Sequence, residues 1–231
     1  MKEKISEILL ASGVTEAQAS ALCDYAEFLA EENGKYNLTA ISSPEEVAVK
    51  HFLDSLLPLR FGLLPEGAKV VDVGSGAGLP GIPLKVARPD LDVTVLDATE
   101  KKVAFMREAA GKAGVKVSAV CARAEEAALK PPLREGFDVA VSRGVAALNV
   151  LCELCLPFVR AGGVFIAYKG RGADEEIAAA KNAIAVLGGK LARVERAPLG
   201  DAERALVVIE KVKPAPGAYP RAFARIKKKP L

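Results

Sequence analysis

Several common features are missing from this sequence. No apolar run approaches the ~20 residues that a membrane-spanning helix needs. The first thirteen residues mix charged and apolar side chains, which is unlike a secretory signal. Four cysteines, at 23, 121, 152 and 155, show no framework spacing, and the Cys152-x-x-Cys155 pair lacks a second pair of metal ligands. We therefore expect a cytoplasmic protein with buried, reduced thiols, no metal site and no contact with a membrane.

The charge is unevenly distributed along the chain. The net charge is +3, but residues 193–231 hold ten Lys or Arg against four Asp or Glu, and no acidic residue follows Lys211. A basic terminus can be a solvated tail, or it can bind an anionic polymer such as nucleic acid; both readings remain open here. The residues that we predict to bind RNA phosphates in this region are Lys211, Lys213, Arg221, Lys227, Lys228 and Lys229. No stable protein partner is evident.

The most informative segment is the glycine-rich run at residues 70–81. A short apolar strand ends in Asp72-Val73 and continues into Gly74-Ser75-Gly76-Ala77-Gly78-Leu79. A dinucleotide-binding site requires the motif G-x-G-x-x-G directly after the strand, but in this sequence Leu79 occupies the position of the third glycine. Asp72 would repel a pyrophosphate and suits the ammonium group of an amino-acid-like ligand. The run therefore predicts S-adenosyl-L-methionine as the cofactor, bound by Asp72, Gly74, Ser75, Gly76, Gly78 and Leu79.

Residues 1–64 are patterned as an N-terminal helical extension. Thr15-Glu-Ala-Gln18 is a capping box for a helix that should run to about Glu32 and end at Asn33-Gly34. Ser43-Pro44-Glu45-Glu46 predicts a second helix start. This second helix carries His51, the only histidine, with Asp54 and Ser55 on the same face. These three side chains form either a hydrogen-bonded patch between helices or a face toward a ligand.

From residue 65 to 231, strands and helices alternate in the pattern of an α/β domain. We expect strands near 69–73, 92–96, 115–120, 137–142, 163–167, 189–196 and 205–211, and helices near 83–87, 100–112, 146–160 and 173–187. Repeated βα steps predict a mostly parallel, Rossmann-like seven-stranded sheet with helices on both faces. The two last strands have no helix between them and predict a terminal hairpin.

The carboxyl ends of the expected strands carry polar residues in a consistent order. In such sheets, ligands bind at these ends. The second strand leads to Asp97, which can accept both ribose hydroxyls. The third leads to Arg123-Ala124-Glu125, where an adenine would rest. The fourth leads to Ser142-Arg143-Gly144.

The fourth strand end also narrows the reaction class. It lacks the Asn/Asp-Pro-Pro-aromatic turn of adenine amino-methyltransferases and the Pro-Cys nucleophile of cytosine C5 enzymes. No strong general base is evident unless His51 reaches the pocket. Guanine N7 carries its own lone pair and needs no base, so catalysis would consist mainly of alignment. Arg143 suits a guanine O6 or a phosphate.

Together these motifs resemble the small-subunit (16S) ribosomal RNA guanine-N7 methyltransferases, also called glucose-inhibited division protein B. The resemblance rests on residues 37–41, 50–56, 72–81, 101–105, 123–125, 137–138, 142–143, 168–170, 204–207 and 219–221. It implies a class I S-adenosylmethionine-dependent methyltransferase that acts on 16S ribosomal RNA or the small ribosomal subunit. It also implies that Gly74, Leu79, Ala124, Glu125 and Arg143 bind the cofactor, and that Arg123, Arg143, Lys169 and Arg204 serve RNA binding or catalysis.

Two alternatives from other classes remain. An NAD-dependent oxidoreductase is disfavoured by Leu79 and Asp72. A non-catalytic RNA-binding or division-associated module that kept the cofactor fold would bind RNA without affinity for S-adenosylmethionine, and nothing in the intact glycine loop favours it.

Overall fold

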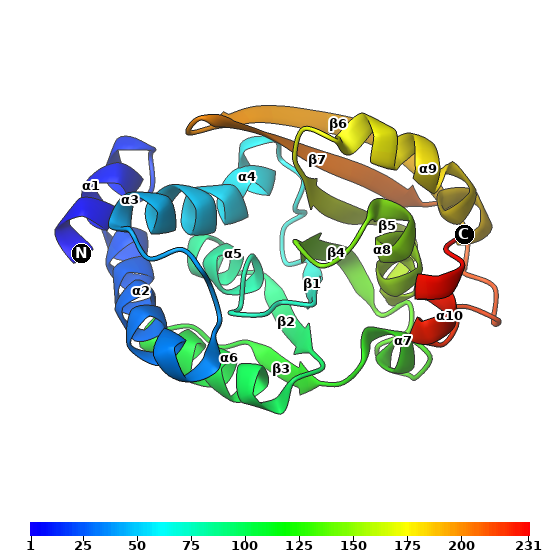
Figure 1. The fold of residues 1–231 in the computed structure, drawn as a ribbon, viewed down its shortest axis with the longest axis horizontal. Coiled ribbons are helices and arrows are strands. Elements are labelled where there is room, and N and C mark those ends of the chain that lie inside the picture. The colour runs from blue at the N-terminus through cyan, green and yellow to red at the C-terminus, as the bar shows by residue number, and fades with distance from the viewer.

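A seven-stranded sheet forms the centre of the molecule, as seen in the computed structural model of residues 1–231 (Figure 1). The strand order is β3-β2-β1-β4-β5-β7-β6. The five strands from β1 to β5 run parallel, and β7 is antiparallel to both β5 and β6. The strands are β1 Lys69–Val73, β2 Asp92–Asp97, β3 Ser118–Cys121, β4 Phe137–Arg143, β5 Val159–Lys169, β6 Gly189–Leu199 and β7 Ala202–Lys211. The predicted mostly parallel sheet and terminal hairpin are confirmed.

Helices cover both faces of this sheet. One hydrophobic cluster lies under α1, α2, α5 and α6, and another under α8, α9 and α10. The helices are α1 Lys2–Ala11, α2 Glu16–Tyr36, α3 Pro44–Glu46, η1 Val47–Leu53, α4 Asp54–Arg60, α5 Gly81–Ala87, α6 Glu100–Lys112, α7 Ala124–Ala127, α8 Leu148–Cys155, η2 Leu156–Phe158, α9 Ala173–Val186 and α10 Phe223–Lys228. None of them is long and apolar enough to cross a membrane.

The N-terminal helices share their core with the sheet. Ile5 of α1 and Leu22 of α2 belong to the same buried cluster as Val70 of β1 and Val93 of β2. The expected boundary near residue 65 therefore marks a change of secondary structure, and apolar packing continues across it.

The second helix begins as predicted but ends later. Thr15 and Gln18 form the capping box. The helix then runs through Asn33-Gly34 to Tyr36 and ends at Asn37, which has a left-handed φ of 53°. The Asn33 side chain accepts hydrogen bonds from the backbone N–H groups of Leu38 and Thr39, at 2.8 and 2.9 Å. Asn33 thus shapes the following loop instead of ending the helix.

Three of the four cysteines are buried, as expected, and all four are free. Burial raises the pKa of the Cys152 and Cys155 thiols well above the ordinary value. Cys121 differs from the expectation, because it lies exposed at the end of the edge strand β3.

Candidate functional site

The glycine-rich loop between β1 and α5 requires its glycines for two separate reasons. Gly74, Gly76 and Gly78 all have positive φ angles, of 73°, 61° and 91°. A Cβ on Gly74 would lie 2.6 Å from Val145, and one on Gly78 would lie 2.4 Å from Ile82. A Cβ on Gly76 would meet nothing within 4 Å. The first and third glycines therefore allow close packing, whereas the second leaves open space above the loop.

Asp72 lies beneath this loop. The side chain is fully buried, and Oδ2 accepts hydrogen bonds from the Gly81 N–H at 2.8 Å and from the Ser75 hydroxyl. The other oxygen, Oδ1, has no partner. Burial raises the pKa of this carboxyl to about 6, against the hydrogen bonds, which lower it. Asp72 therefore supports the loop, and its predicted contact with the ammonium group of a ligand remains a prediction.

Asp72→Asn should change the pH dependence of stability. The pKa of Asp72 is raised from 3.8 to about 6 in the folded protein, so ionisation of this buried carboxyl destabilises the fold. The stability that depends on the neutral carboxyl is fully present below pH 3.8 and is lost as the pH rises through 6. Asparagine keeps the acceptor and cannot ionise. We expect the free energy of unfolding of the variant to rise by about 2.5 kcal/mol relative to that of wild type as the pH increases from 4 to 7.5. Thermal melting of both proteins at these pH values measures this difference, and a constant difference would contradict the assignment.

A residue of the N-terminal extension fixes the top of the loop. The Tyr25 hydroxyl of α2 donates a hydrogen bond to the Ala77 carbonyl. Tyr25 is fully buried, and this burial raises the pKa of the phenol, so the hydroxyl remains a neutral donor. The sequence carried no signal for this contact, because a tyrosine among the apolar residues of α2 has the pattern of a core residue.

A cavity of about 370 Å³ opens over the loop. Asp97 lies on its wall at the end of β2, where the two carboxylate oxygens accept N–H groups of Thr99 and Gly76 at 2.9 and 3.2 Å. The Nζ atom of Lys102 lies 3.8 Å from Oδ2 of Asp97. The remaining lining residues are Leu38, Thr39, His51, Gly74, Ser75, Gly76, Ala77, Leu79, Arg143, Gly144 and Val145. A concave site that has an acidic residue on its wall, a glycine turn and open space above the backbone of that turn fits an amino acid linked to adenosine.

Another cavity, of about 670 Å³, lies on the far side of the same helical segment and is mainly apolar. Val49 and Leu53 of η1 line it, whereas His51 of η1 lines the cavity over the loop. It contains no residue of the glycine loop, so the smaller cavity is the candidate cofactor site.

His51 lines the same cavity and is held neutral. Its Nε2 atom lies 3.0 Å from the Thr39 hydroxyl, and Nδ1 is buried without a partner. Burial, aided by the positive charge of Arg143, lowers the pKa of His51 to about 4. Asp54 and Ser55, predicted to share a face with His51, are also buried, and the Ser55 hydroxyl donates to the His51 carbonyl. The segment that carries them, η1, is a π-helix, a feature that often occurs at functional sites.

Asp54 joins two arginines from distant parts of the chain. Arg143 donates from Nη1 to Asp54 at 2.8 Å and to the Lys50 carbonyl at 2.9 Å. Arg204 of β7 forms a two-point contact with the same carboxylate, at 2.8 and 2.9 Å. Asp54 is fully buried, so one carboxylate balances two guanidinium groups and leaves a net positive charge beside the cavity. Arg143 lines the cavity, whereas Arg204 does not.

Lys169 is nearly buried and faces the loop after β4. Its ammonium group donates to the Ala146 carbonyl and pairs with Glu176, both at 2.7 Å. The same Glu176 accepts the Leu148 N–H at 2.6 Å. Lys169 therefore fixes the segment that carries Val145, which faces the glycine loop, and does not itself line the cavity.

The third strand end lies at the same edge of the sheet. Cys121 of β3 is paired with Asp97 of β2, and Arg123, Ala124 and Glu125 follow directly. Arg123 is exposed, whereas Ala124 and Glu125 are partly buried. None of the three lines the cavity, so their predicted role at an adenine remains a prediction.

Two of the basic residues predicted to bind RNA are engaged within the protein, and one of them, Lys211, is not accessible to RNA. Lys211 is fully buried, because it continues the inward-facing series of β7 and donates to the Leu156 carbonyl at 2.7 Å. Burial lowers the pKa of Lys211 to about 8. Arg221 is paired at two points with the buried Glu153, at 2.6 and 2.7 Å. Lys213, Lys227, Lys228 and Lys229 are exposed, as expected.

Comparison with known proteins identifies the family. The sequence model of the GidB family, described as rRNA small subunit methyltransferase G, matches residues 18–207. The curated relative from Alkaliphilus metalliredigens is 47% identical over 221 residues, which cover 94% of this chain and 92% of the relative. The relative from Clostridium novyi is 44% identical over 210 residues, which cover 90% of this chain and 86% of the relative. Both are named Ribosomal RNA small subunit methyltransferase G. These matches decide against the oxidoreductase alternative.

Solved structures support the fold at low sequence identity. TrmN from Thermus thermophilus is 20% identical with a TM-score of 0.53, over 71% of this chain and 53% of that one. TYW2 from M. jannaschii, solved with AdoMet, is 15% identical with a TM-score of 0.54, over 68% and 75%. The sheet is that of the class I methyltransferases, whose methyl donor is S-adenosylmethionine. The chain therefore belongs to the rRNA small subunit methyltransferase G family of S-adenosylmethionine-dependent enzymes.

Proposed function

We propose that this protein transfers a methyl group to N7 of a guanine in 16S ribosomal RNA. The observation that carries the choice of atom is the environment of His51, whose Nδ1 atom is buried without a partner and whose Nε2 atom lies 3.0 Å from the Thr39 hydroxyl. With a pKa of about 4, this histidine is neutral at physiological pH and is a poor acceptor for a proton from an amine or a hydroxyl. An acceptor atom that already has a lone pair needs no such base, and guanine N7 is one.

S-adenosylmethionine supplies an electrophilic methyl carbon at this site. We assign its binding to the loop residues Gly74, Ser75, Gly76, Gly78 and Leu79 and to Asp97, with Ala124 and Glu125 at the adenine end. The Asp72 carboxylate supports the loop from below. The N7 lone pair would form the new bond to the methyl carbon as the carbon–sulfur bond of the sulfonium breaks, which would leave the thioether S-adenosylhomocysteine, and no proton would need to leave the base before transfer. The residues of the chain therefore act by orienting the two reactants and excluding water.

Arg143 is the side chain that we assign to the acceptor base. One of its nitrogens, Nη1, is held by Asp54 and the Lys50 carbonyl, which fixes the plane of the guanidinium. The other N–H groups have no partner within the protein. They can donate to guanine O6 or to a phosphate. Contact with N7 itself would block the reaction, so O6 or phosphate is the proposed target.

We assign supporting roles to the other basic residues. Arg204 shares Asp54 with Arg143 and so holds that carboxylate in place. Lys169 holds the loop after β4. Arg123 is exposed at the sheet edge and is proposed to contact RNA. On this proposal the partner is 16S ribosomal RNA, alone or within the small subunit, the enzyme works without a stable protein partner, and it acts in the cytoplasm.

Mass spectrometry of 16S ribosomal RNA tests the product. RNA from a strain without the gene should lack one 7-methylguanosine that RNA from the complemented strain contains. A missing mark on another atom or on another RNA would contradict the proposal.

The pH dependence tests the mechanism. The single-turnover rate with saturating substrate should be nearly flat from about pH 6 to pH 8, because His51 stays neutral and no proton must be removed. His51→Ala can lower the rate through its buried neighbours but should leave the shape of the profile unchanged. A rise through this range that disappears in His51→Ala would make His51 a general base and point to an exocyclic amine or a hydroxyl.

A further inference from the structure

The segment that follows β7 is attached to the body of the protein. Residues 212–229, here named the C-terminal strap, leave β7 at the buried Lys211. The Ala215 N–H donates to Glu135 at 2.8 Å, and the Ala215 carbonyl accepts from Arg134 at 2.9 Å. Arg134 also donates to the Tyr219 carbonyl at 3.0 Å and to Ala128, just after α7, at 3.2 Å. These contacts tie the strap to the end of α7.

A buried ion pair holds the strap a second time. Glu153 of α8 is fully buried and accepts three hydrogen bonds from Arg221: from the backbone N–H at 2.8 Å, from Nε at 2.7 Å and from Nη2 at 2.6 Å. A buried carboxylate with this many donors fixes both the side chain and the main chain of its partner.

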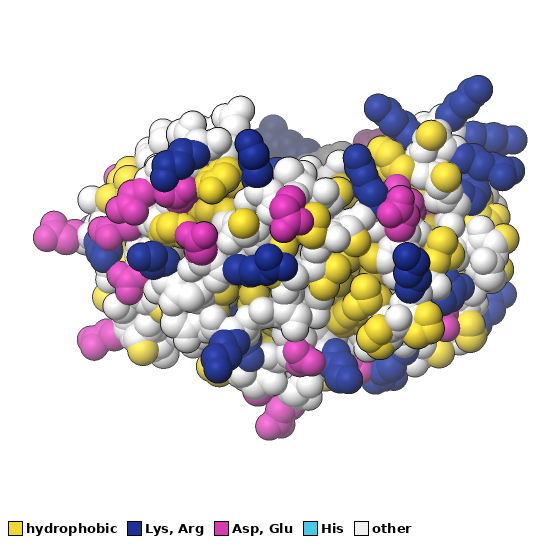
Figure 2. All heavy atoms as spheres, turned by 90° about the horizontal axis from the view of Figure 1, so that it is seen from below, with side chains coloured by type: hydrophobic (Ala, Val, Ile, Leu, Met, Phe, Trp, Pro, Cys, Tyr) yellow, Lys and Arg dark blue, Asp and Glu magenta, His cyan; other side chains and the backbone are white.

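The short helix at the end of the strap presents its charges outward. Ile226 of α10 is fully buried in the hydrophobic cluster under α8 and α9. Its neighbours Arg225, Lys227, Lys228 and Lys229 are exposed and form no ion pair, and Lys213 is likewise exposed and unpaired. In Figure 2 many Lys and Arg side chains gather at the right-hand end of the molecule, the end where Figure 1 places α10.

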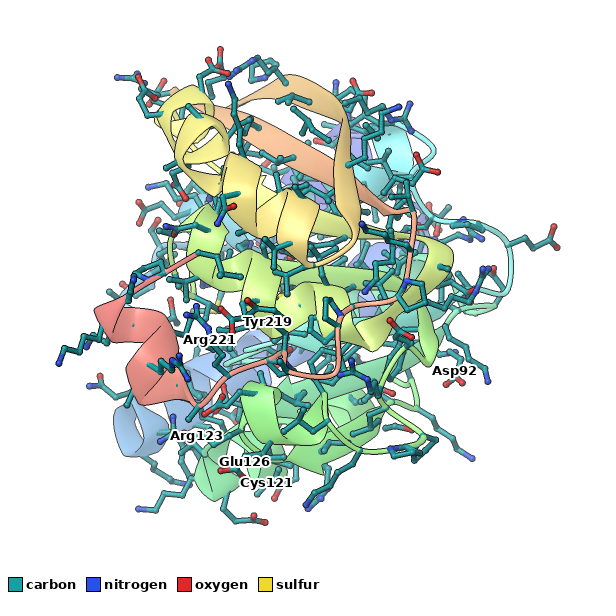
Figure 3. The ribbon with its side chains drawn as sticks, turned by 90° about the vertical axis from the view of Figure 1, so that its right-hand side faces the viewer. Asp92, Cys121, Arg123, Glu126, Tyr219 and Arg221 are labelled. Atoms are coloured by element: carbon teal, nitrogen blue, oxygen red, sulfur yellow. The ribbon has the colours of Figure 1, made fainter.

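The strap lies at the same end of the molecule as the third strand end. Figures 1 and 3 agree in placing α10 beside α7, and Figure 3 shows Arg123, Cys121 and Glu126 on the same side as Tyr219 and Arg221. Cys121 is paired with Asp97, which lines the cavity over the glycine loop. The unpaired charges are therefore carried on a fixed support toward the edge of the sheet that holds the cavity.

We propose that the C-terminal strap is a preformed platform for the phosphate backbone of RNA, and that Glu153 is the positioning residue that holds it. The proposal rests on the proposed function for the identity of its ligand. Closely spaced cations without acidic neighbours suit a repeating phosphate chain, and contacts of this kind place RNA without reading its sequence. The unpaired platform residues are Lys213, Arg225, Lys227, Lys228 and Lys229.

The sharpest test is Glu153→Gln, because two models predict opposite results. If the basic residues act only as a charged tail, loss of one negative charge should leave RNA binding unchanged or tighten it. If the platform must be held in place, RNA binding should weaken although the protein becomes more positive. We expect a loss of roughly tenfold or more at ~0.15 M salt, as for about two lost phosphate contacts.

The matched control is Asp138→Asn. This change also removes one carboxylate from an arginine pair, with Arg160, but at the opposite, amino edge of the sheet, where β1 and β4 begin. It should not weaken RNA binding. Filter binding to a 16S ribosomal RNA transcript over a salt series, with calorimetry of S-adenosylmethionine, measures both ligands, and cofactor affinity should be unchanged in each variant.

A second variant keeps the test independent of the buried pair. Replacement of Lys227, Lys228 and Lys229 by glutamine alters only exposed side chains and should reduce the salt slope by about 2–3. An unchanged slope, or a folded Glu153→Gln protein that binds RNA as tightly as wild type, overturns the proposal. So does equal competition by polyglutamate, which would indicate an acidic protein as the partner. Mass spectrometry of the product tests the proposed methyl transfer separately. If both variants bind RNA normally and the methylated product is still found, the platform proposal fails while the proposed function stands.

Discussion

Gly76→Val should weaken S-adenosylmethionine binding by roughly tenfold to a hundredfold. The backbone at Gly76 has a φ of 61°, and a Cβ there would point into open space in the cavity over the loop. A branched side chain would fill the volume that we assign to the cofactor, and overpacking of this kind costs about 1–3 kcal/mol. Titration calorimetry measures the affinity directly.

Gly62→Val separates this effect from backbone strain. Gly62 has nearly the same φ, 60°, and equally open surroundings, but it lies in the turn after α4. Both variants should lose similar stability, and only Gly76→Val should lose cofactor affinity. Gly74→Val should affect both properties, since its side chain would meet Val145 at 2.6 Å. Equal cofactor affinity for wild type and Gly76→Val would remove the loop from the binding site.

Arg143→Ala should lower the single-turnover rate by about a hundredfold. The substitution removes the guanidinium that lines the cavity and leaves the buried Asp54 with Arg204 alone. Loss of alignment at a reacting pair has effects of this size. Arg143→Lys should restore little activity, because an ammonium group cannot reproduce a planar guanidinium whose Nη1 binds Asp54 and the Lys50 carbonyl while its other N–H groups are left for the proposed contact with the base.

Arg160→Ala is the control for loss of a paired arginine. Arg160 pairs with Asp138 at 2.7 Å and is half exposed, far from the cavity. The single-turnover rate of Arg160→Ala should match that of wild type. A near-normal rate for folded Arg143→Ala enzyme would contradict the assignment of Arg143 to the acceptor base.

The sequence predicted the parts of the site that depend on local chemistry. Alternating glycines after a strand and an acidic residue at the next strand end place Gly76 and Asp97 in one cavity, as the structure shows. Lys211 could also have been placed correctly. Ala205, Val207 and Ile209 face one hydrophobic cluster, and a period of two assigns Lys211 to the same buried face.

Other contacts depend on partners distant in the chain and left no signal in the sequence. The sequence around Arg221 has the composition of a solvated tail, and only the structure shows that Arg221 pairs with the buried Glu153. Tyr25 is 52 residues from the Ala77 carbonyl that it holds. Asp54 was expected to share a face with His51, but only the fold shows that it binds two arginines, one of them 150 residues away.

The strand order has a consequence for how the chain is made. The penultimate strand, β6, reaches the sheet only through β7, which lies between β5 and β6. During synthesis β6 therefore leaves the ribosome before its only partner exists, and its edge stays unpaired until β7 inserts. The same insertion brings Arg204 to Asp54, 150 residues earlier in the chain. A contact of such long range forms slowly. The cluster of Arg143, Asp54 and Arg204 beside the cavity is thus completed only when nearly the whole chain has emerged, so a nascent chain has its glycine loop before Asp54 has both of its arginines.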